Sequence, residues 1–369
     1  MEDSGSQQFS RGDRISDRFE IEKHIGSGML GVTYLAKDTK NATPVALKFV
    51  KPKLVAHEKD RGRFEQAFAR SAAVQGEGLI PFGEIGEHDG QLYYSQEYFP
   101  SQNLRQLIDD YQRQQKSFSL QESCQIVLKV LEAVQQLHDA GIIHGNLKPE
   151  NILVQSRQAG PGGSKVVRTI KVDDAGLAAV VNPTIFADSY ISRDEARYLA
   201  PELSSFDEDG AFPSDVYSVG VIFYELLVGQ TPRGTYLSPT QLRGDLAHHI
   251  DDIVELAISE SAEDRYRTAV DMLNDIQRSF SGEFIDDRRS QTFRNVLIGL
   301  FAAVVTVLVV GGYLVSGEPD DGYNEAVAQD NQIRSVVKAQ NPLPTQEEWE
   351  AKLLPGMIYV PGGSFVMGR

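Results

Sequence analysis

The sequence predicts an α+β protein that continues into a single transmembrane helix. Strand-like stretches surround a glycine-rich turn near the amino terminus, a long helical period begins near residue 119, and residues 296–315 carry no charge. The charged and apolar fractions, 24% and 41%, are those of a folded protein. The formal net charge of −16 argues against a nucleic-acid-binding surface. The single cysteine, Cys124, excludes an internal disulfide and is expected to be a buried core thiol.

The amino-terminal part predicts strands at 19–26 and 32–38 around the turn Gly-Ser-Gly-Met-Leu-Gly at 26–31. Glycines allow backbone amides to approach a phosphate without a Cβ in the way. A lone pattern of this kind is weak evidence, because it also occurs in dinucleotide folds and ordinary hairpins. Here a strand follows the glycines, and Val-Ala-Leu-Lys at 45–48 comes next. This order favours a phosphate-binding role for Lys48 over an ordinary surface charge.

Three further elements follow from apolar spacing. A helix is predicted at about 57–74, a strand at 91–99 and a helix at 119–140. The last has apolar residues with a helical period and is expected to lie in the core: Val127, Val130, Leu131, Val134 and Leu137. The stretch at 156–164 is rich in glycine and serine and is expected to be a flexible connection.

Residues 143–154 read Ile-His-Gly-Asn-Leu-Lys-Pro-Glu-Asn-Ile-Leu-Val. Asp-Ala-Gly follows at 174–176, Ala-Pro-Glu at 200–202, Ser-Asp-Val-Tyr-Ser at 214–218 and Asp-Arg-Tyr at 264–266. Together with the glycine turn and Lys48, these motifs resemble those of the eukaryotic-type protein kinases, in the same order. The resemblance covers about residues 18–280 and implies a two-lobed kinase fold.

The resemblance assigns roles to individual residues. Lys48 would bind the α- and β-phosphates of ATP, and Asn151 and Asp174 would hold Mg²⁺. Gln96 would be the residue before the hinge that joins the lobes. Other nucleotide contacts would come from Gly26, Gly28, Gly31, Thr33, Ala46, Glu97, Phe99 and Leu153. Structural roles would fall to His144, Glu202, Asp215 and Arg265, with Asp215 holding the catalytic-loop backbone and Arg265 pairing with Glu202.

The catalytic loop departs from the family pattern at the position that matters most for phosphate transfer. Asn146 stands where the family has the aspartate that accepts the substrate hydroxyl proton, and Gly145 replaces the preceding arginine. An amide has no ionisable proton site near neutral pH, so Asn146 is unsuited to that task. The second catalytic-loop residue, Lys148, is retained.

Four other positions also depart from the pattern. Ala67 falls where the helix glutamate should pair with Lys48, and Ser71 falls where an apolar residue is usual. Ala175 replaces the phenylalanine of the metal-binding motif. Glu195 takes the place of a threonine beside the catalytic loop, which predicts a short contact between Glu195 and Lys148. We expect this contact to fill the place of a substrate hydroxyl.

The uncharged stretch at 296–315 is long enough to span a bilayer as a helix, because about 20 apolar residues suffice. A buried core helix is the alternative, but the stretch follows the end of the kinase-like region. Arg288, Arg289 and Arg294 precede it, and Glu318, Asp320 and Asp321 follow it. The positive-inside rule then predicts a cytoplasmic kinase-like domain and an extracytoplasmic carboxyl end.

The last residues, Gly-Met-Ile-Tyr-Val-Pro-Gly-Gly-Ser-Phe-Val-Met-Gly-Arg at 356–369, resemble the opening strands of the formylglycine-generating, sulfatase-modifying family. No catalytic residue of that family is present, so a truncated start of such a domain is expected, and the chain is expected to be a fragment or a truncated product. The predicted organisation is a disordered tail at 1–14, a kinase-like domain at 15–281, a juxtamembrane segment at 282–295, the span at 296–315, a polar extracytoplasmic linker at 316–350 and the truncated domain at 351–369.

The resemblance is to bacterial membrane serine/threonine kinases with a degenerate catalytic loop. The first hypothesis is a pseudokinase that binds Mg-ATP, transfers phosphate poorly and acts through a regulated partner. The second is an active serine/threonine kinase with a reorganised site and a protein substrate. The third is a membrane tether that binds no nucleotide. A homodimer is left open, and no nucleic-acid partner is expected.

Overall fold

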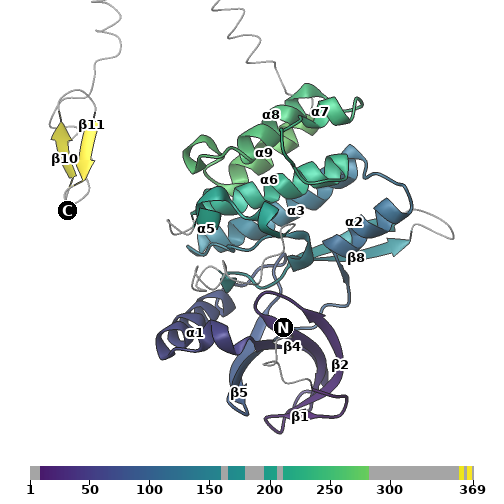
Figure 1. The fold of residues 1–369 in the computed structure, drawn as a ribbon, viewed down its shortest axis with the longest axis vertical. Coiled ribbons are helices and arrows are strands. Elements are labelled where there is room, and N and C mark those ends of the chain that lie inside the picture. Colours follow the sequence, from purple (N-terminus) through teal and green to yellow (C-terminus); the bar gives the residue numbers. More distant parts are fainter. Residues whose placement is uncertain are drawn as a thin grey trace, which may run out of the picture. The chain divides into compact units, whose positions relative to one another are not determined.

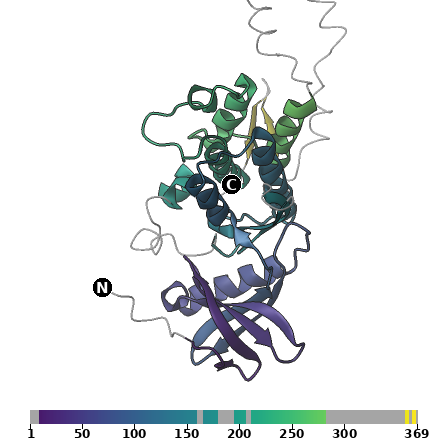
Figure 2. The same ribbon diagram turned by 90° about the vertical axis from the view of Figure 1, so that its right-hand side faces the viewer.

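Figure 1 shows the fold of the chain in a computed structural model, which describes residues 9–158, 165–178, 195–205, 211–281, 357–360 and 364–367. The chain divides into two compact units, Met1–Ile285 and Asp286–Arg369. Within the first unit, a curled sheet forms one lobe and a group of helices forms the other, as Figures 1 and 2 show from two directions.

The first lobe is built on a six-stranded antiparallel sheet with the order β1-β2-β3-β4-β6-β5. Because side chains alternate along a strand, neighbouring residues pack on opposite faces. Tyr93 belongs to one apolar cluster and Tyr94 to the other, which also contains residues of helix α1 (Glu58–Ala72). The strands are β1 (Arg14–Ile15), β2 (Phe19–Ser27), β3 (Gly31–Asp38), β4 (Thr43–Val50), β5 (Phe82–His88) and β6 (Gln91–Glu97).

Part of the segment expected to be a tail is folded onto this sheet. The ring of Phe9 lies 4.5 Å from that of Phe49 and meets Tyr34 edge-on at 5.8 Å, measured between ring centroids. The backbone amide of Gly12 donates to the carbonyl of Ile21 at 2.8 Å. The expected tail is therefore too long, because the Phe9 ring and backbone hydrogen bonds to β2 hold residues 9–14 on the sheet.

The second lobe is organised around α3 (Leu120–Asp139), which confirms the helix predicted at 119–140. Ser119 begins it with a capping box, in which the Ser119 hydroxyl accepts from the amide of Glu122 at 3.1 Å. Cys124 is 0% exposed, as predicted, and its burial raises its thiol pKa to about 12. The other helices are α2 (Leu104–Arg113), α5 (Pro201–Ser205), α6 (Phe212–Val228), α7 (Pro239–Leu242), α8 (His248–Ala257) and α9 (Ala269–Ser281).

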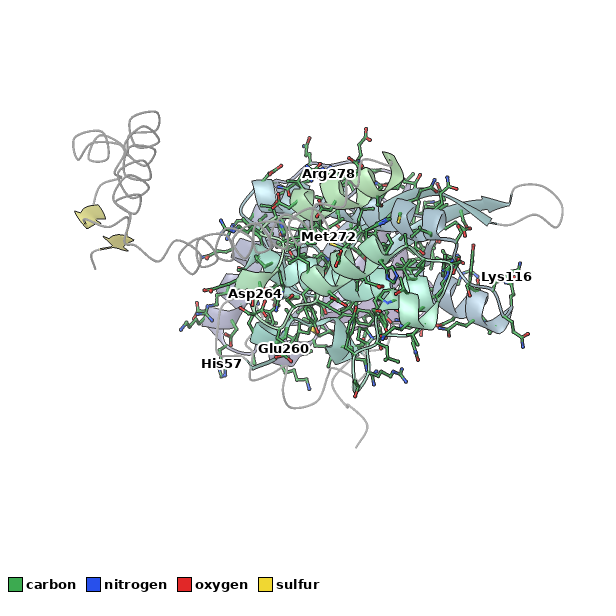
Figure 3. All side chains as sticks on the ribbon, turned by 90° about the horizontal axis from the view of Figure 1, so that it is seen from above. His57, Lys116, Glu260, Asp264, Met272 and Arg278 are labelled. Atoms are coloured by element: carbon green, nitrogen blue, oxygen red, sulfur yellow. The ribbon has the colours of Figure 1, made fainter. Side chains whose placement is uncertain are left out.

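In the helical lobe, most apolar side chains lie inside and most charged side chains lie at the surface. Met272 of α9 is fully buried among the helices, whereas Lys116 and Arg278 lie at the periphery, as Figure 3 shows. Short 3-10 helices complete the lobe and the link before α1. They are η1 (Pro52–Val55), η2 (Pro149–Asn151), η4 (Glu195–Tyr198) and η5 (Ala262–Asp264).

Two smaller sheets complete the description. Strands β7 (Gln102–Asn103), β8 (Ile152–Gln158) and β9 (Lys165–Val172) form a three-stranded sheet. In the second unit, β10 (Met357–Val360) pairs antiparallel with β11 (Ser364–Met367). Within the described part of the chain, no helix is both long and apolar enough to cross a bilayer. The predicted span at 296–315, with its flanking segments, lies outside that part.

Candidate nucleotide site

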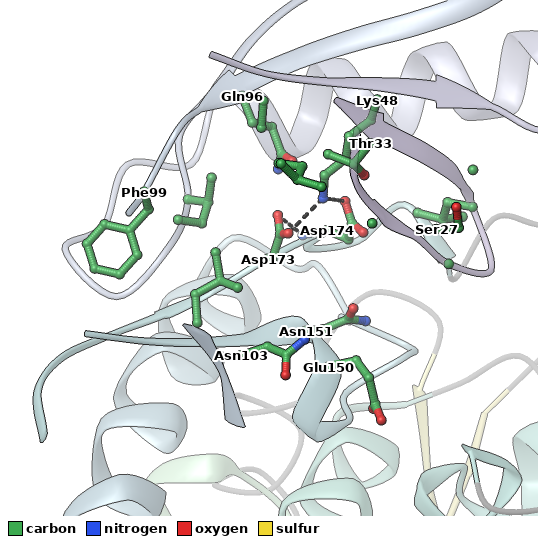
Figure 4. A pocket seen from close by; sticks show the side chains of 18 of the residues that line it. Ser27, Thr33, Lys48, Gln96, Phe99, Asn103, Glu150, Asn151, Asp173 and Asp174 are labelled. Atoms are coloured by element: carbon green, nitrogen blue, oxygen red, sulfur yellow. Dashed lines mark hydrogen bonds and ion pairs between the residues drawn. The ribbon is translucent and has the colours of Figure 1, made fainter. Parts of the chain in front are cut away.

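A cavity of about 550 Å³ lies between the two lobes of the first unit, and Figure 4 shows it from close by. Its walls come from the β2–β3 turn, β4, β6, the link to α2, the catalytic loop and the end of β9. Every residue that the sequence assigned to nucleotide, metal or catalysis borders it: Gly26, Gly28, Gly31, Thr33, Ala46, Lys48, Glu97, Phe99, Asn146, Lys148, Asn151, Leu153 and Asp174.

The glycine-rich turn covers one wall of this pocket. A Cβ on Gly31 would lie only 1.8 Å from the carbonyl oxygen of Phe49, so this position requires glycine for close approach to β4. Gly26 and Gly28 have open space where a Cβ would be, which leaves their backbone accessible to a ligand. The tip residues Met29 and Leu30 are buried in the same apolar cluster as α1, which the sequence reasoning did not anticipate.

Lys48 has two carboxylate partners in place of the expected helix glutamate. Its ammonium donates to Asp173 at 2.7 Å and to Asp174 at 2.6 Å, the pair marked by dashed lines in Figure 4. Ala67 of α1 is buried and supplies no charge. Ala67 therefore cannot be the family's acidic partner of Lys48, as expected. The sequence did not predict that Asp173 binds Lys48 instead. Burial alone would lower the pKa of Lys48, yet the two carboxylates raise it above its ordinary value.

Tyr94 completes this polar group from the strand next to Lys48. The two residues are ladder partners across β4 and β6, so both side chains point to the same face. The Tyr94 hydroxyl donates to Asp174 at 2.7 Å. Burial and the charge of Asp174 raise the pKa of Tyr94 well above its usual value, so the hydroxyl remains a donor at neutral pH. Sequence reasoning missed Tyr94, because only the strand pairing brings it to the aspartate.

The catalytic loop is held from below by one buried carboxylate. Asp215 of α6 accepts from the backbone amides of His144 at 2.8 Å and Gly145 at 2.9 Å. Asn151 donates through its side-chain amide to the carbonyl of Asn146 at 2.8 Å. These contacts fix the backbone of the loop. The side chain that the loop presents at position 146 is an amide and not a carboxylate.

The predicted contact between Lys148 and Glu195 is present. The Lys148 ammonium donates to Glu195 Oε1 at 2.5 Å, and the Lys148 side chain is 6% exposed. Both residues border the pocket beside Asn146. Lys148, which would otherwise be available to a phosphate or a substrate hydroxyl, is therefore bound to a carboxylate of the same chain.

The profile of the protein kinase domain family matches residues 19–300. The chain belongs to the protein kinase family. Members of this family act with ATP and Mg²⁺ in general. The pocket suits them, because Lys48 can meet phosphates, and Asn151 and Asp174 are oxygen ligands of the kind Mg²⁺ prefers.

Several bacterial kinases resemble this chain. Probable serine/threonine-protein kinase PknB of Corynebacterium glutamicum is 30% identical over 72% of this chain and 42% of its own length. Serine/threonine-protein kinase PknB of Mycobacterium leprae is 28% identical over 73% and 44%. The chain thus spans less than half the length of these curated relatives. The PknI kinase domain of Mycobacterium tuberculosis shares the fold, with a TM-score of 0.58 and 22% identity over 73% of this chain and 99% of that structure.

The remaining kinase motifs form the scaffold of the helical lobe. Arg265 pairs with Glu202 through two contacts of 2.7 and 2.8 Å, as the kinase resemblance implied. Burial would raise the pKa of Glu202, but the hydrogen bond from Arg265 lowers it overall. This ion pair fixes α5 against the loop before α9.

Small side chains allow the metal-binding motif of this chain to lie close to Ser71 of α1. A Cβ on Gly176 would lie 2.6 Å from the Ser71 hydroxyl and 2.7 Å from a methyl of Ile142. Gly176 also has a φ of +77°, which favours glycine. Ala175 is buried in the helical-lobe core. Thus close backbone approach occupies the space beside Ser71, where the family pattern predicted larger apolar groups.

The hinge side of the pocket has backbone and side-chain polar groups. The Glu97 amide donates to the carbonyl of Pro81 at 3.0 Å, and its carboxylate accepts from Lys171 at 3.1 Å. Lys171 also lies 5.3 Å from the ring centroid of Phe99. Just before this hinge, Gln96 is buried at the inner part of the pocket.

Proposed function

We propose that this chain is a membrane-anchored, kinase-like signalling protein that binds Mg-ATP, transfers phosphate poorly and acts through a regulated partner protein. One arrangement carries the proposal: Asn146 stands at the position of the proton acceptor, and Glu195 binds Lys148 at 2.5 Å beside it. An amide cannot take the hydroxyl proton, and the ion pair occupies the lysine that would steady the transferred phosphate.

Nucleotide binding is supported by the retained half of the site. Lys48, Asn151 and Asp174 border one cavity beneath a glycine-rich turn. The carboxylates of Asp173 and Asp174 leave the surroundings of Lys48 with net negative charge. ATP therefore needs its magnesium ion to enter, because the metal offsets phosphate charge that Lys48 alone does not offset. Thermal shift of the full chain should show stabilisation by ATP with Mg²⁺, and much less with ATP and a chelator.

An active serine/threonine kinase is the second candidate. The similarity to serine/threonine-protein kinases and the retention of Lys48, Lys148, Asn151 and Asp174 favour it. Positioning and electrostatics supply most of the catalysis of phosphate transfer, so a rate without the usual acceptor is chemically conceivable.

Radiolabelled phosphate transfer by the full chain separates these candidates. We expect no labelling above the Lys48→Ala variant. We expect a gain when Asn146→Asp is combined with Glu195→Thr, which frees Lys148, and a smaller gain from Asn146→Asp alone. Labelling of a serine or threonine by the unmodified chain, at a rate abolished by Lys48→Ala, would establish the active kinase instead.

The thermal-shift experiment tests the membrane-tether hypothesis. A ligand at 100 times its Kd should raise the free energy of unfolding by about 2.7 kcal/mol. If saturating Mg-ATP gives no thermal shift, the membrane-tether hypothesis is favoured.

The membrane assignment is supported by the charge-free stretch at 296–315 and the arginines that precede it. We propose one spanning helix there, a cytoplasmic kinase domain and an extracytoplasmic carboxyl end that resembles the start of a formylglycine-generating domain. Protease added outside intact cells should remove the carboxyl end and leave the kinase domain whole; cleavage of the kinase domain would reverse the proposed orientation.

A further inference from the structure

Gln96 carries two buried polar atoms for which no hydrogen-bond partner exists among the residues that the structure describes. The residue lies on β6, is 2% exposed and borders the nucleotide cavity. Neither its amide oxygen Oε1 nor its amide nitrogen Nε2 is bonded. Buried polar groups are normally paired, because an unpaired donor or acceptor keeps its full desolvation cost. The two unpaired amide atoms of Gln96 therefore need an explanation.

Other polar residues of the same strand are satisfied. Gln91 donates its amide to the carbonyl of Val50 at 3.2 Å, and the Ser95 hydroxyl accepts from the amide of Glu84 at 2.9 Å. Gln96 faces the other side of the sheet from Ser95, the side that it shares with its ladder partner Ala46. Figure 4 shows its side chain directed into the pocket near Lys48.

The free groups on Gln96 are an acceptor beside a donor. Adenine presents the matching pair on one edge, where the N6 amino group donates and N7 accepts, and glutamine can bind both at once. Guanine presents two acceptors, O6 and N7, on that edge, so one group of the amide would face a like group. A glutamine at the inner part of an adenine pocket can therefore select the base as well as fill space.

We propose that Gln96 reads the N6–N7 edge of the adenine base and is a specificity-determining residue of the nucleotide site. The proposal rests on the nucleotide binding proposed above and adds to it a contact between the Gln96 side chain and the base. Binding of adenine would satisfy both amide atoms, so the unpaired groups of the free protein become part of the selectivity for ATP.

The test compares Mg-ATP with Mg-7-deaza-ATP, which lacks the N7 acceptor, by direct titration of the full chain. The unmodified protein should bind the deaza analogue about tenfold more weakly, the effect of one hydrogen bond to a buried site. Gln96→Met, of similar length and without polar atoms, should bind both equally and should melt no lower than the unmodified protein without nucleotide. Gln125→Met, on the exposed side of α3, is the matched control and should keep the preference.

A second variant distinguishes loss of the base contact from damage to the fold. Gln96→Glu places a carboxylate oxygen opposite N7, so the preference should reverse in favour of the deaza analogue, a sign change that misfolding does not produce. Equal binding of both nucleotides by the unmodified protein, or a preference that persists in Gln96→Met, overturns this inference while nucleotide binding stands. Failure of the unmodified protein to bind either nucleotide overturns the proposed function together with it.

Discussion

At the scale of single residues, the part of the pocket that would meet phosphates has more carboxylates than cations. Among the charged residues that border the pocket, five form ion pairs with one another: Lys48, Lys148, Asp173, Asp174 and Glu195. Each lysine is already bound to a carboxylate, so a nucleotide competes with the chain's own groups for them. Tyr94 adds a neutral donor to Asp174, which holds that carboxylate in place without adding charge.

Removal of that donor should have a measurable cost. Tyr94→Phe deletes the hydroxyl that binds Asp174 and leaves the ring among Phe64, Phe68 and Phe82. Because the acceptor is charged and the site buried, the free energy of unfolding should fall by about 1.5–3 kcal/mol. Urea denaturation measures it. Tyr93→Phe, on the opposite face of the same strand, is the matched control and should change less; equal losses would mean that the Asp174 contact contributes nothing special.

At the scale of elements, an apolar joint connects the glycine-rich turn to α1. Met29 and Leu30 pack in one cluster with Phe64, Phe68 and Leu177. In addition, the Lys51 amide donates to the carbonyl of Leu30 at 2.9 Å. The turn, α1 and Leu177, which follows the metal-binding motif, therefore share one apolar cluster, whereas the family pattern predicts an ion pair between Lys48 and a glutamate on α1.

Leu30→Ala tests this joint. Leu30 is 5% exposed, so loss of its side chain should reduce the free energy of unfolding by about 2 kcal/mol, at the lower end for a buried leucine because a turn can partly collapse. Ile25→Ala on β2, where the side chain is 40% exposed, should change it by less than about 0.5 kcal/mol. A differential-scanning comparison in which both variants melt alike would mean that the tip packs only loosely.

The same scale separates what sequence can predict from what it cannot. The strands at 19–26 and 32–38 and the helix at 119–140 were predictable, because local spacing and the Ser119 cap determine them. The contact of Glu195 with Lys148 followed from motif positions. The bonds of Lys48 to Asp173 and of Tyr94 to Asp174 did not, because strand pairing and lobe closure bring together residues 80 to 126 positions apart. Phe9 was missed because one aromatic residue in a polar stretch carries no periodic signal.

At the scale of the whole molecule, each lobe contains an ion pair between an arginine and a carboxylate that is at most 12% exposed. Arg18 meets Asp38 through two bonds of 2.9 Å in the strand lobe, and Arg265 meets Glu202 in the helical lobe. The hydrogen bond from Arg18 lowers the pKa of Asp38 to about 2, from an ordinary 3.8. Glu202 shifts in the same direction. Both lobes therefore depend on carboxylates that stay ionised.

Acid should weaken the fold through these groups. A carboxylate with a lower pKa in the folded state stabilises fully above its unfolded pKa and loses that contribution as pH falls through the folded value. For Asp38 this is about 2 kcal/mol, present above pH 4 and lost towards pH 2. Urea denaturation between pH 2 and 6 should show the decline. Asp38→Asn should flatten part of it, whereas Asp17→Asn, at an exposed position, should not; identical slopes in both variants would contradict the assignment.

The single cysteine can report when the helical lobe opens. Cys124 sits in α3 with no exposed surface, and its thiol pKa of about 12 leaves almost no reactive thiolate in the closed protein. An alkylating reagent can therefore modify the chain only when the helical lobe opens. The rate of that modification rises with the fraction of molecules whose helical lobe is open, so a nucleotide or partner that holds the lobe shut should slow the reaction, with no label or engineered probe required.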